Sequence, residues 1–517
     1  MDILFRVDAG PVMGSGHVMR CLALADALRR RGAATTFVSA SLLPGMVEAM
    51  RKAGHEVVEL GSTQSSAADG AGWDLHAAGP EAQAGDAAQV RAALAGRRFN
   101  WVVVDHYQLG APWEEAIRPI AAAVMTIDDL ANRAHACDLL LDQTAGRTAG
   151  EYRPLVPGHC TLLMGASFSL LRPGFAAMRT ASLRRRRQPA PVARILVFLG
   201  GTDVGGLTEA VVRGLLDRLP GVDIHVVIGG AAKTKHALER LAGEQDRVHL
   251  HVDTPDMPSL IANADLAVGA AGSASWERCC LGLPAILLVL ADNQRLVADN
   301  LEAIGASITA YSPAQAVELA ARLAGSEQQL QSMIAAAAGV TDGAGTERVA
   351  DALLGQSSDP AATAPLTVRP AADTDSLALW LWRNDPVTRA TSKTSEPVPW
   401  QQHARWFAAC LASPDRWLLM GEVGAEPVGM VRFDRREDGS HLVSINVAPA
   451  WRGRKIGAAL LGKAHEALQG RFGSARCVAE IHDANTASQR IFARCGFERV
   501  GGAEDGWGRY ERPGDLG

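Results

Sequence analysis

The sequence lacks long apolar runs and any strong excess of charge. No window offers about 18 uninterrupted apolar residues, the length that a membrane-spanning helix needs. The opening MDILFRVDAG has no basic segment followed by an apolar core, so it does not resemble a secretory signal. A formal net charge of −5 over 517 residues gives no indication of a nucleic-acid partner. We therefore expect a cytoplasmic protein that binds neither nucleic acid nor a membrane.

Cysteine and metal-binding patterns are also missing. The 8 cysteines form no CxxC pair and no disulfide framework, which favours a reducing compartment. The sequence contains neither HExxH nor a paired-cysteine zinc motif, and it has no repeat of short period. We expect no metal ion in the mechanism.

The pattern of apolar runs predicts three domains. Over residues 1–182, short apolar runs alternate with helical patterns, which favours a doubly wound parallel sheet. The same alternation restarts at RILVFLGG and predicts a second Rossmann-like domain over 190–352. Prolines and small residues indicate a linker over 353–365, and an α+β domain is expected over 366–517. The basic run RRRRQPAP between the first two domains is expected to be a solvated linker.

A glycine-rich loop near the start of the chain is the first candidate site. VDAGPVMGSGHVMRC follows an apolar strand-like run and leads into a helical pattern. Gly14 and Gly16 lack a Cβ atom, so a ligand can approach their backbone, and the helix start favours an anion there. His17 would place a titratable nitrogen beside a phosphate-bearing substrate. It also fits a residue that only packs at the helix start, and the local sequence leaves both alternatives open.

A second loop has similar chemistry. In ADLAVGAAGSASWERCC, small residues around Gly272 and Ser273 would let backbone amides reach a diphosphate. Glu277, just inside the next helix, could accept two hydrogen bonds from a ribose diol. It equally fits a first-turn charge that complements the helix dipole.

These loops resemble those of a known family. Together with VVVDHYQL, TIDDLANRAHACDLLLDQT, LLMGASFSLLRPGF and VFLGGTD, they are similar to GT-B-fold glycosyltransferases. More closely, they resemble the UDP-2,4-diacetamido-2,4,6-trideoxy-β-L-altropyranose hydrolases of pseudaminic acid biosynthesis. The resemblance covers residue 1 to about residue 345, with the motifs in the family's order. It implies two Rossmann-like domains of GT-B type and a water, activated by His17, that attacks the anomeric carbon and expels UDP.

The same resemblance implies further site residues. Asp8, which flanks the loop, would be a second catalytic residue, and Asp128 and Asp129 fit either sugar contacts or solvated acids. Phe168 stands where the family usually has tyrosine, which removes a hydroxyl from the site. The implied substrate contacts are Gly14, Ser15, Gly16, Arg20, Asp105, His106, Tyr107, Gly200, Gly201, Gly272, Ser273, Ser275, Glu277, Gln294 and Asn300.

The C-terminal block resembles the Gcn5-related N-acetyltransferases (GNAT). HLVSINVAPAWRGRKIGAALLGKAHEAL matches their cofactor-binding motif, and NTASQRIFARCGF matches their second signature. The resemblance implies acetyl-CoA as cosubstrate. Lys455 stands where the family often has glycine, and Phe492 replaces a tyrosine that protonates the thiolate, a role that Tyr510 could take. The implied cofactor contacts are Val447, Arg452, Gly453, Arg454, Lys455, Ile456, Gly457, Ala458 and Asn485.

These observations predict a bifunctional enzyme. The C-terminal domain would acetylate the 4-amino group of a UDP-sugar, and the N-terminal domains would hydrolyse the product to UDP and free sugar. One alternative is a GT-B glycosyltransferase whose GNAT domain acetylates protein N-termini. Another is a sugar-nucleotide sensor with a CoA-binding appendage.

Overall fold

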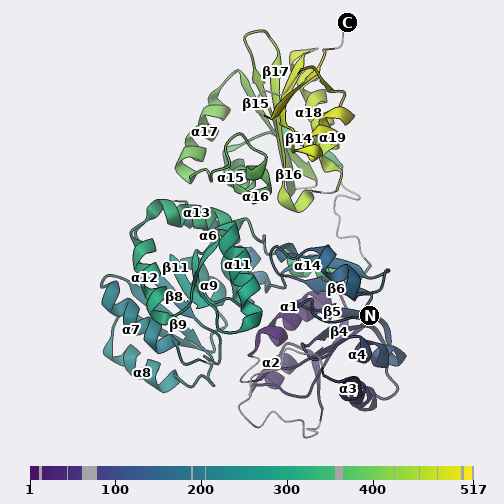
Figure 1. Ribbon diagram of the computed structural model, residues 1–517, viewed down its shortest axis with the longest axis vertical. Coiled ribbons are helices and arrows are strands. Elements are labelled where there is room, and N and C mark those ends of the chain that lie inside the picture. The colour runs from purple at the N-terminus through teal and green to yellow at the C-terminus, as the bar shows by residue number, and fades with distance from the viewer. Residues whose placement is uncertain are drawn as a thin grey trace. The chain divides into compact units, whose positions relative to one another are not determined.

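The computed structural model divides the chain into two compact units, Met1–Gln356 and Ser357–Gly517 (Figure 1). The structure describes residues 1–517 except 11–13, 44, 61–77, 188–189, 204, 356–364, 424–425, 453, 474, 502–505 and 515–517. Most of the predicted linker at 353–365 therefore lies outside the described residues, as does Gly453.

Unit 1 begins with a parallel sheet of 7 strands in the order β3-β2-β1-β4-β5-β6-β7. Apolar side chains of one sheet face pack on α1 and α14, and those of the other face pack on α3 and α4. The strands are β1 (Asp2–Val7), β2 (Ala34–Ser39), β3 (Glu56–Glu59), β4 (Phe99–Asp105), β5 (Ala121–Ile127), β6 (Leu139–Asp142) and β7 (Thr161–Met164). The helices are α1 (Gly16–Arg30), α2 (Met46–Lys52), α3 (Pro80–Ala93), α4 (Ala111–Ile117) and α5 (Ala149–Tyr152).

A second parallel sheet of 6 strands follows, in the order β10-β9-β8-β11-β12-β13. Helices α7, α8 and α12 bury one face, and α6, α9, α10 and α11 bury the other. The strands are β8 (Arg194–Phe198), β9 (Asp223–Ile228), β10 (Val248–Val252), β11 (Leu266–Ala270), β12 (Ala285–Leu288) and β13 (Ser307–Ala310). The helices are α6 (Pro173–Arg186), α7 (Thr208–Arg218), α8 (Lys235–Glu244), α9 (Met257–Asn263), α10 (Ala274–Cys280), α11 (Arg295–Ile304), α12 (Pro313–Ala324), α13 (Glu327–Ala338) and α14 (Gly345–Leu353).

Both sheets reverse their strand order at one point, and these points position the site. The reversal lies between β1 and β4 in the first sheet and between β8 and β11 in the second. In open α/β sheets, ligands bind beyond the carboxyl ends of the strands at such a point, because the flanking loops diverge there. The glycine loops singled out in the sequence follow β1, β8 and β11.

Two helices cross between the sheets of unit 1. Helix α6, which contains the boundary predicted at residue 182, packs on the second sheet through Phe175. Helix α14 returns to the first sheet, where Val349 joins the core and the Trp101 indole N–H donates to the Leu353 carbonyl at 2.8 Å. The chain therefore passes from the first sheet to the second and back.

The prediction that RRRRQPAP is a solvated linker was wrong for Arg186, although Arg184 and Arg185 are exposed. Helix α6 continues through Arg186, which is only 4% exposed. The Arg186 guanidinium donates to the carbonyls of Ile261 and Ala264, at the C-terminal end of α9, at 2.7 Å each. A helix C-terminus carries unpaired carbonyls and partial negative charge, so it stabilises a buried cation without a carboxylate. Composition alone could not reveal this acceptor.

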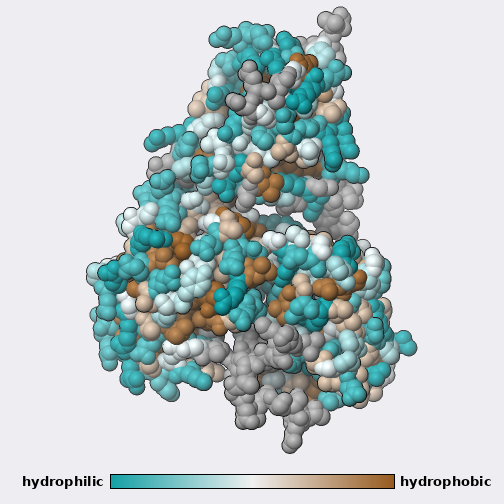
Figure 2. Space-filling view, viewed as in Figure 1, coloured by the Kyte–Doolittle hydropathy of each residue, from teal (hydrophilic) through white to brown (hydrophobic). Residues whose placement is uncertain are grey.

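Unit 2 contains a sheet of 7 strands in the order β14-β15-β16-β17-β18-β20-β19, with α18 packed on it through Leu460 and Leu468. Figure 2 shows a mainly hydrophilic surface on the visible face of this unit. The strands are β14 (Leu366–Pro370), β15 (Arg416–Val423), β16 (Glu426–Arg435), β17 (His441–Val447), β18 (Cys477–His482), β19 (Glu498–Arg499) and β20 (Trp507–Arg512). The helices are α15 (Ser376–Asn384), α16 (Pro386–Ala390), α17 (Trp400–Ala412), α18 (Ile456–Phe472) and α19 (Thr486–Arg494). The predicted fold class, two doubly wound domains followed by an α+β domain, is confirmed.

No described helix is long and apolar enough to span a membrane. Among the same residues, no group of three or more His, Cys, Asp or Glu side chains is arranged to hold a metal ion.

Candidate functional site

A cavity of about 620 Å³ lies where the carboxyl ends of the two sheets of unit 1 face each other. Loops following β1, β4 and β5 line it on one side, and loops following β8, β11 and β12 line it on the other. Eleven residues predicted from sequence are among its lining: Gly14, Ser15, Gly16, His17, Arg20, Tyr107, Gly200, Gly201, Gly272, Ser273 and Gln294.

The imidazole of His17 faces this cavity and is held from behind by Asp105. Asp105 ends β4 and is fully buried, and its Oδ1 lies 2.6 Å from Nδ1 of His17. Burial raises the pKa of Asp105, but Arg20 and His17 outweigh it and hold that pKa well below its ordinary value. An ionised carboxylate only accepts hydrogen bonds, and Oδ1 of Asp105 lies closer to Nδ1 of His17 than Nη2 of Arg20 does, at 2.6 Å against 3.1 Å, so Nδ1 carries the hydrogen. In the neutral imidazole, this tautomer leaves Nε2 of His17 with a free lone pair.

Arg20 joins two carboxylates at the edge of the cavity. Its Nε and Nη2 each donate to Asp105 at 2.6 Å, and its Nη1 donates to Oδ2 of Asp129 at 3.1 Å. Arg20 lies one turn after His17 on α1, which explains why both side chains reach Asp105. The pair of Arg20 and Asp105 therefore fixes His17 in one orientation.

Tyr107 packs against His17 and connects the two sides of the cavity. The two rings meet edge to face with centroids 4.7 Å apart, and the side-chain amide of Asn293 donates to the Tyr107 hydroxyl at 3.1 Å. On the glycine side, a Cβ added at Gly16 would lie 3.1 Å from Oγ of Ser273. A larger residue at Gly16 would therefore press against the opposite loop.

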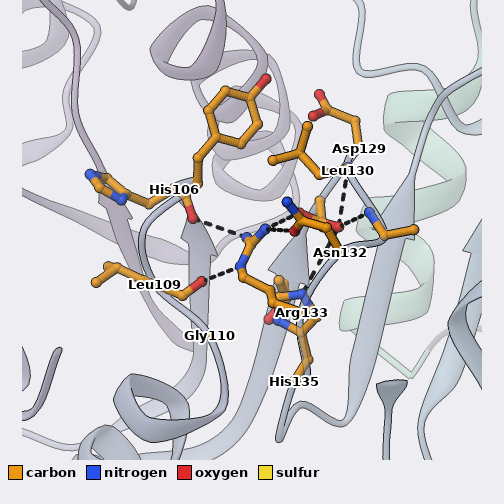
Figure 3. Close-up of polar contacts among 12 residues, drawn as sticks. His106, Leu109, Gly110, Asp129, Leu130, Asn132, Arg133 and His135 are labelled. Atoms are coloured by element: carbon orange, nitrogen blue, oxygen red, sulfur yellow. Dashed lines mark hydrogen bonds and ion pairs between the residues drawn. The ribbon is translucent and has the colours of Figure 1, made fainter. Parts of the chain in front are cut away.

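Arg133 braces the loops that carry Tyr107 and Asp129 (Figure 3). Its guanidinium donates to the carbonyls of His106 and Leu109, at 3.1 and 2.9 Å, and pairs with Oδ1 of Asp128 at 2.7 Å. The Arg133 side chain is only 8% exposed. One buried cation thus ties the loop after β4 to the loop after β5.

Asp8 and His106 are not among the residues that line the cavity. Arg6 pairs with Asp8 at 2.7 Å, and His106 Nε2 lies 3.3 Å from the same carboxylate. Burial raises the pKa of Asp8, but the opposite effect of Arg6 and His106 is larger and holds that pKa well below its ordinary value. The Asp8 carboxylate is therefore ionised and accepts hydrogen bonds. The backbone N–H of Ala40 also donates to it, at 2.8 Å. These partners give Asp8 a structural task, and its placement does not support the catalytic role predicted for it.

Apart from Asp105, which lies behind His17, three other predicted contacts lie outside the lining. Ser275 is buried and its hydroxyl oxygen accepts from Arg278 at 3.0 Å, while the Asn300 amide donates to the Ala145 carbonyl at 2.7 Å.

Glu277 lies half-buried on α10, whose neighbouring residues Ala274 and Trp276 do line the cavity. Burial raises the pKa of Glu277 to about 7, although Arg172 and Arg278 lower it. Within the described part of the chain, its carboxylate has no hydrogen bond or ion pair.

The sequence reasoning missed Gln143, Thr144 and Asn293, and it left Asp129 undecided, although all four line the cavity. Gln143 and Thr144 directly follow β6, and Asn293 precedes Gln294 in the loop after β12. Their position after an apolar strand was the available signal, because the carboxyl ends of parallel strands meet at one edge.

In unit 2, strands β17 and β18 separate after a short contact. They pair in parallel only at His441 with Cys477 and Leu442 with Val478, although β17 continues to Val447. Beyond Leu442, the paired ladder ends and backbone groups of β17 are left without partners from β18. The loop that follows β17 leads into α18, and this loop and the first turn of α18 together contain most of the predicted cofactor contacts.

Several of these predicted side chains have protein partners. Arg452 donates to Oδ2 of Asp385 at 2.6 Å and to the Thr388 hydroxyl at 2.7 Å. The Arg454 guanidinium lies over the Trp451 ring, 5.0 Å from its centroid. The side-chain oxygen of Asn485 accepts from Ser488 N–H at 3.0 Å and caps α19.

The backbone of this loop fits the glycine-rich pattern. Lys455, directly before α18, has φ of +61°, a left-handed conformation that favours glycine. A Cβ added at Gly457 would lie 2.5 Å from Cδ1 of Ile491, so α18 and α19 approach each other closely here.

The remaining predicted residues of unit 2 lie near this point or in the core. Val447 lies beside Gly457, Ile456 is half-buried, and the Ala458 carbonyl accepts from the Cys495 thiol. Tyr510 is buried in the core cluster that contains Phe492.

The comparisons with known proteins agree with this arrangement. Residues 195–349 match the glycosyltransferase family 28 C-terminal domain, and residues 375–497 match the acetyltransferase (GNAT) family. The chain is 21% identical over 532 residues to the uncharacterized protein MJ1062 of Methanocaldococcus jannaschii, covering 98% of this chain and 99% of that protein.

Two further matches concern unit 1. The UDP-2,4-diacetamido-2,4,6-trideoxy-β-L-altropyranose hydrolase of Campylobacter jejuni is 22% identical over 275 residues, which are 53% of this chain and 86% of the hydrolase. The crystal structure of MurG from Acinetobacter baumannii aligns with a TM-score of 0.46 and 16% identity over 69% of this chain and all of that one. The chain thus joins an N-terminal unit similar to the altropyranose hydrolase of Campylobacter jejuni to a C-terminal unit that matches the acetyltransferase (GNAT) family.

Proposed function

We propose that unit 1 hydrolyses a UDP-sugar of the 2,4-diacetamido-2,4,6-trideoxy-β-L-altropyranose type to UDP and free sugar. The observation that carries this proposal is the orientation of His17, whose Nδ1 is committed to Asp105 while its ring faces the cavity. The relationship to the Campylobacter jejuni hydrolase supports the choice of substrate.

In the proposed reaction, Nε2 of His17 accepts a proton from a water molecule. The water oxygen forms a bond to the anomeric carbon of the sugar, and the bond from that carbon to the diphosphate oxygen breaks. UDP leaves with the electron pair, and the sugar inverts its configuration. The ionised Asp105 stabilises the imidazolium that forms, and a positioned base of this kind contributes about 10² to 10⁴ in rate.

The remaining cavity residues would hold the nucleotide. Glycines after β1, β8 and β11 leave room for the diphosphate beside the backbone, and the N-terminus of α1 favours its charge. Glu277 lies outside the lining but on the same helix as the lining residues Ala274 and Trp276, and its unpaired carboxylate would accept hydrogen bonds from the ribose hydroxyls when UDP is bound. UDP is a stable leaving group, so these contacts stabilise charge that develops as the bond breaks.

Incubation of the full chain with the UDP-sugar tests the proposal. We expect the protein to release equal amounts of UDP and free sugar without any acceptor. The NMR signal of the anomeric proton monitors this release. His17→Ala should slow this release by about 10² to 10⁴ while it keeps UDP binding.

The match to a glycosyltransferase family 28 domain favours one alternative, transfer of the sugar to an acceptor hydroxyl. In that case, the protein would be inert toward the UDP-sugar alone and active once an acceptor is supplied.

For unit 2, we propose N-acetylation of the 4-amino group of the corresponding UDP-amino sugar, with acetyl-CoA as cosubstrate. The match to the GNAT family and the separation of β17 from β18 support this proposal. Acetyl-CoA supplies the acetyl thioester, and the loop before α18 with Asn485 would bind it. Turnover with the UDP-amino sugar, compared with basic peptides, separates this activity from acetylation of protein N-termini.

A further inference from the structure

Asp129 is the cavity carboxylate whose hydrogen bonding is incomplete. It follows β5 directly and lines the cavity, and its side chain is 22% exposed. Its Oδ2 accepts from Arg20, but its Oδ1 is buried and has no hydrogen-bond partner among the described residues. A buried acceptor without a donor costs free energy, which a donor from a ligand would recover.

The Asp129 carboxylate is also held in place. Arg20 fixes one oxygen, and Arg147 donates to the Asp129 backbone carbonyl at 2.7 Å. The adjacent Asp128 is bound by Arg133 and by the N–H of Ala131 at 2.9 Å. Figure 3 shows the Asp129 carboxylate directed away from the Arg133 brace. The carboxylate is therefore held in one position, with its unpaired Oδ1 buried at the wall of the cavity.

Charge decides which part of the ligand Asp129 can meet. Arg20 is the one cation that contacts both Asp105 and Asp129, so these three side chains together carry a net negative charge. A diphosphate oxygen beside Asp129 would be repelled and would bring no hydrogen. An amide N–H or a hydroxyl is neutral and brings the missing donor.

We propose that Oδ1 of Asp129 accepts a hydrogen bond from an N–H or O–H substituent of the sugar and so selects sugars that carry a donor at that place. This inference rests on the proposed binding of a UDP-sugar in the cavity, but not on its hydrolysis. A carboxylate discriminates strongly, because a sugar without the donor leaves the buried oxygen unpaired.

Binding measurements in a variant that cannot hydrolyse the ligand test the inference. In the His17→Ala background, calorimetry compares UDP with UDP-2,4-diacetamido-2,4,6-trideoxy-β-L-altropyranose. Asp129→Asn keeps the size of the side chain but turns one oxygen into a donor. We expect the UDP-sugar to bind about tenfold or more weakly, since a hydrogen bond to a charged group is lost, while UDP changes less than about twofold.

Asp292→Asn is the matched control, because Asp292 also belongs to the cavity rim and the substitution removes the same charge. We expect it to change the affinities for UDP and the UDP-sugar by the same factor. Equal weakening of both ligands by Asp129→Asn, or an unchanged affinity for the UDP-sugar, would overturn the inference.

A second measurement needs no variant at Asp129. Analogues of the UDP-sugar are N-methylated at one acetamido group or lack one hydroxyl, so that each has lost a single donor hydrogen. The His17→Ala protein should bind one of these analogues less tightly than the parent UDP-sugar and the others. Equal affinities for the parent UDP-sugar and all of these analogues would overturn the inference. If the wild-type chain binds the UDP-sugar but never releases UDP, the proposed hydrolysis fails while the Asp129 contact is still tested.

Discussion

The two candidate sites differ in how their charged side chains are held. In unit 1, buried partners lie behind the side chains: Asp105 binds His17 and Arg20, both of which still face the cavity. In unit 2, the predicted ligand groups are themselves occupied, because Arg452 binds Asp385 and Asn485 caps α19. A motif therefore indicates the backbone of a site, whereas the role of each side chain depends on partners elsewhere in the sequence.

The strongest test of this difference is His17→Ala. We expect a loss of hydrolysis of about 10² to 10⁴, because the general base is removed, with acetylation by unit 2 unchanged. UDP release and acetyl-CoA consumption are measured on the same preparation. Loss of both activities would mean that the variant disturbs more than the unit 1 cavity.

Asp105→Asn tests the brace behind the base. The amide can donate to Nδ1 of His17 and so favour the tautomer in which Nε2 carries the hydrogen and cannot accept a proton. We expect hydrolysis to fall by about 10² or more, with the KM for the UDP-sugar much less affected. Asp8→Asn is a comparison variant, since Asp8 lies behind the cavity. A larger loss of kcat for Asp8→Asn than for Asp105→Asn would reverse our assignment of the two aspartates.

Glu277 predicts a pH dependence of nucleoside binding. Its folded pKa of about 7 lies above the ordinary value of 4.5, so the carboxylate is mostly protonated below pH 7 and ionised above it. Only the ionised form accepts hydrogen bonds from both ribose hydroxyls. We expect the affinity for uridine, which has no phosphate to titrate, to rise severalfold between about pH 6 and pH 8.

Glu277→Gln should remove this rise. The same raised pKa means that Glu277 favours the folded state at low pH. This contribution to the free energy of unfolding is lost as the pH rises from about 4.5, the ordinary pKa, through about 7, the folded pKa. The free energy of unfolding of Glu277→Gln should therefore change less between these two pH values than that of the wild-type chain. A pH dependence that persists in Glu277→Gln would contradict the assignment.

In unit 2, a double-mutant cycle between Arg452 and Asp385 measures how firmly the arginine is committed. If the ion pair is the main task of Arg452, then Arg452→Ala, Asp385→Ala and the double variant should weaken acetyl-CoA binding to a similar degree. We expect a coupling energy of about 1 kcal/mol in the free energy of unfolding, because Arg452 is partly exposed although Asp385 is buried. If the losses of acetyl-CoA affinity in the two single variants instead add up in the double variant, Arg452 binds the cofactor independently of Asp385.

The smallest expected effect comes from Lys455. Its left-handed backbone costs an L-residue about 1 kcal/mol, and glycine avoids this cost but loses more entropy on folding. Lys455→Gly should therefore change the free energy of unfolding by less than about 1 kcal/mol, whereas Lys455→Val should lower it by about 1 kcal/mol or more. Thermal unfolding of the two variants measures both. Equal stabilities would show that the turn adapts to a β-branched residue.

The apolar spacing and turn residues of the sequence predicted those parts of the fold that depend on residues close together in the chain. The strand before Asp8, the glycine loop and helix α1 follow from apolar period and turn residues, and the site falls where parallel strands end. The partners of the site residues are long-range: Asp105 lies 88 residues from His17, and nothing in the local sequence of either residue pairs the two. The burial of Arg186 depends on carbonyls at the end of another helix, which carry no side-chain signal.

The path of α6 and α14 limits how this molecule can be divided. A fragment ending at residue 182 would keep most of α6 but would lack the second sheet, on which this helix packs. It would also expose the apolar surface of the first sheet that Val349 and Leu353 cover. A fragment starting at residue 190 would leave the carbonyls at the end of α9 without the arginines that bind them. Excision or recombination in the region between the sheets therefore damages both halves, and the smallest piece of unit 1 that can be moved intact into another gene ends after α14.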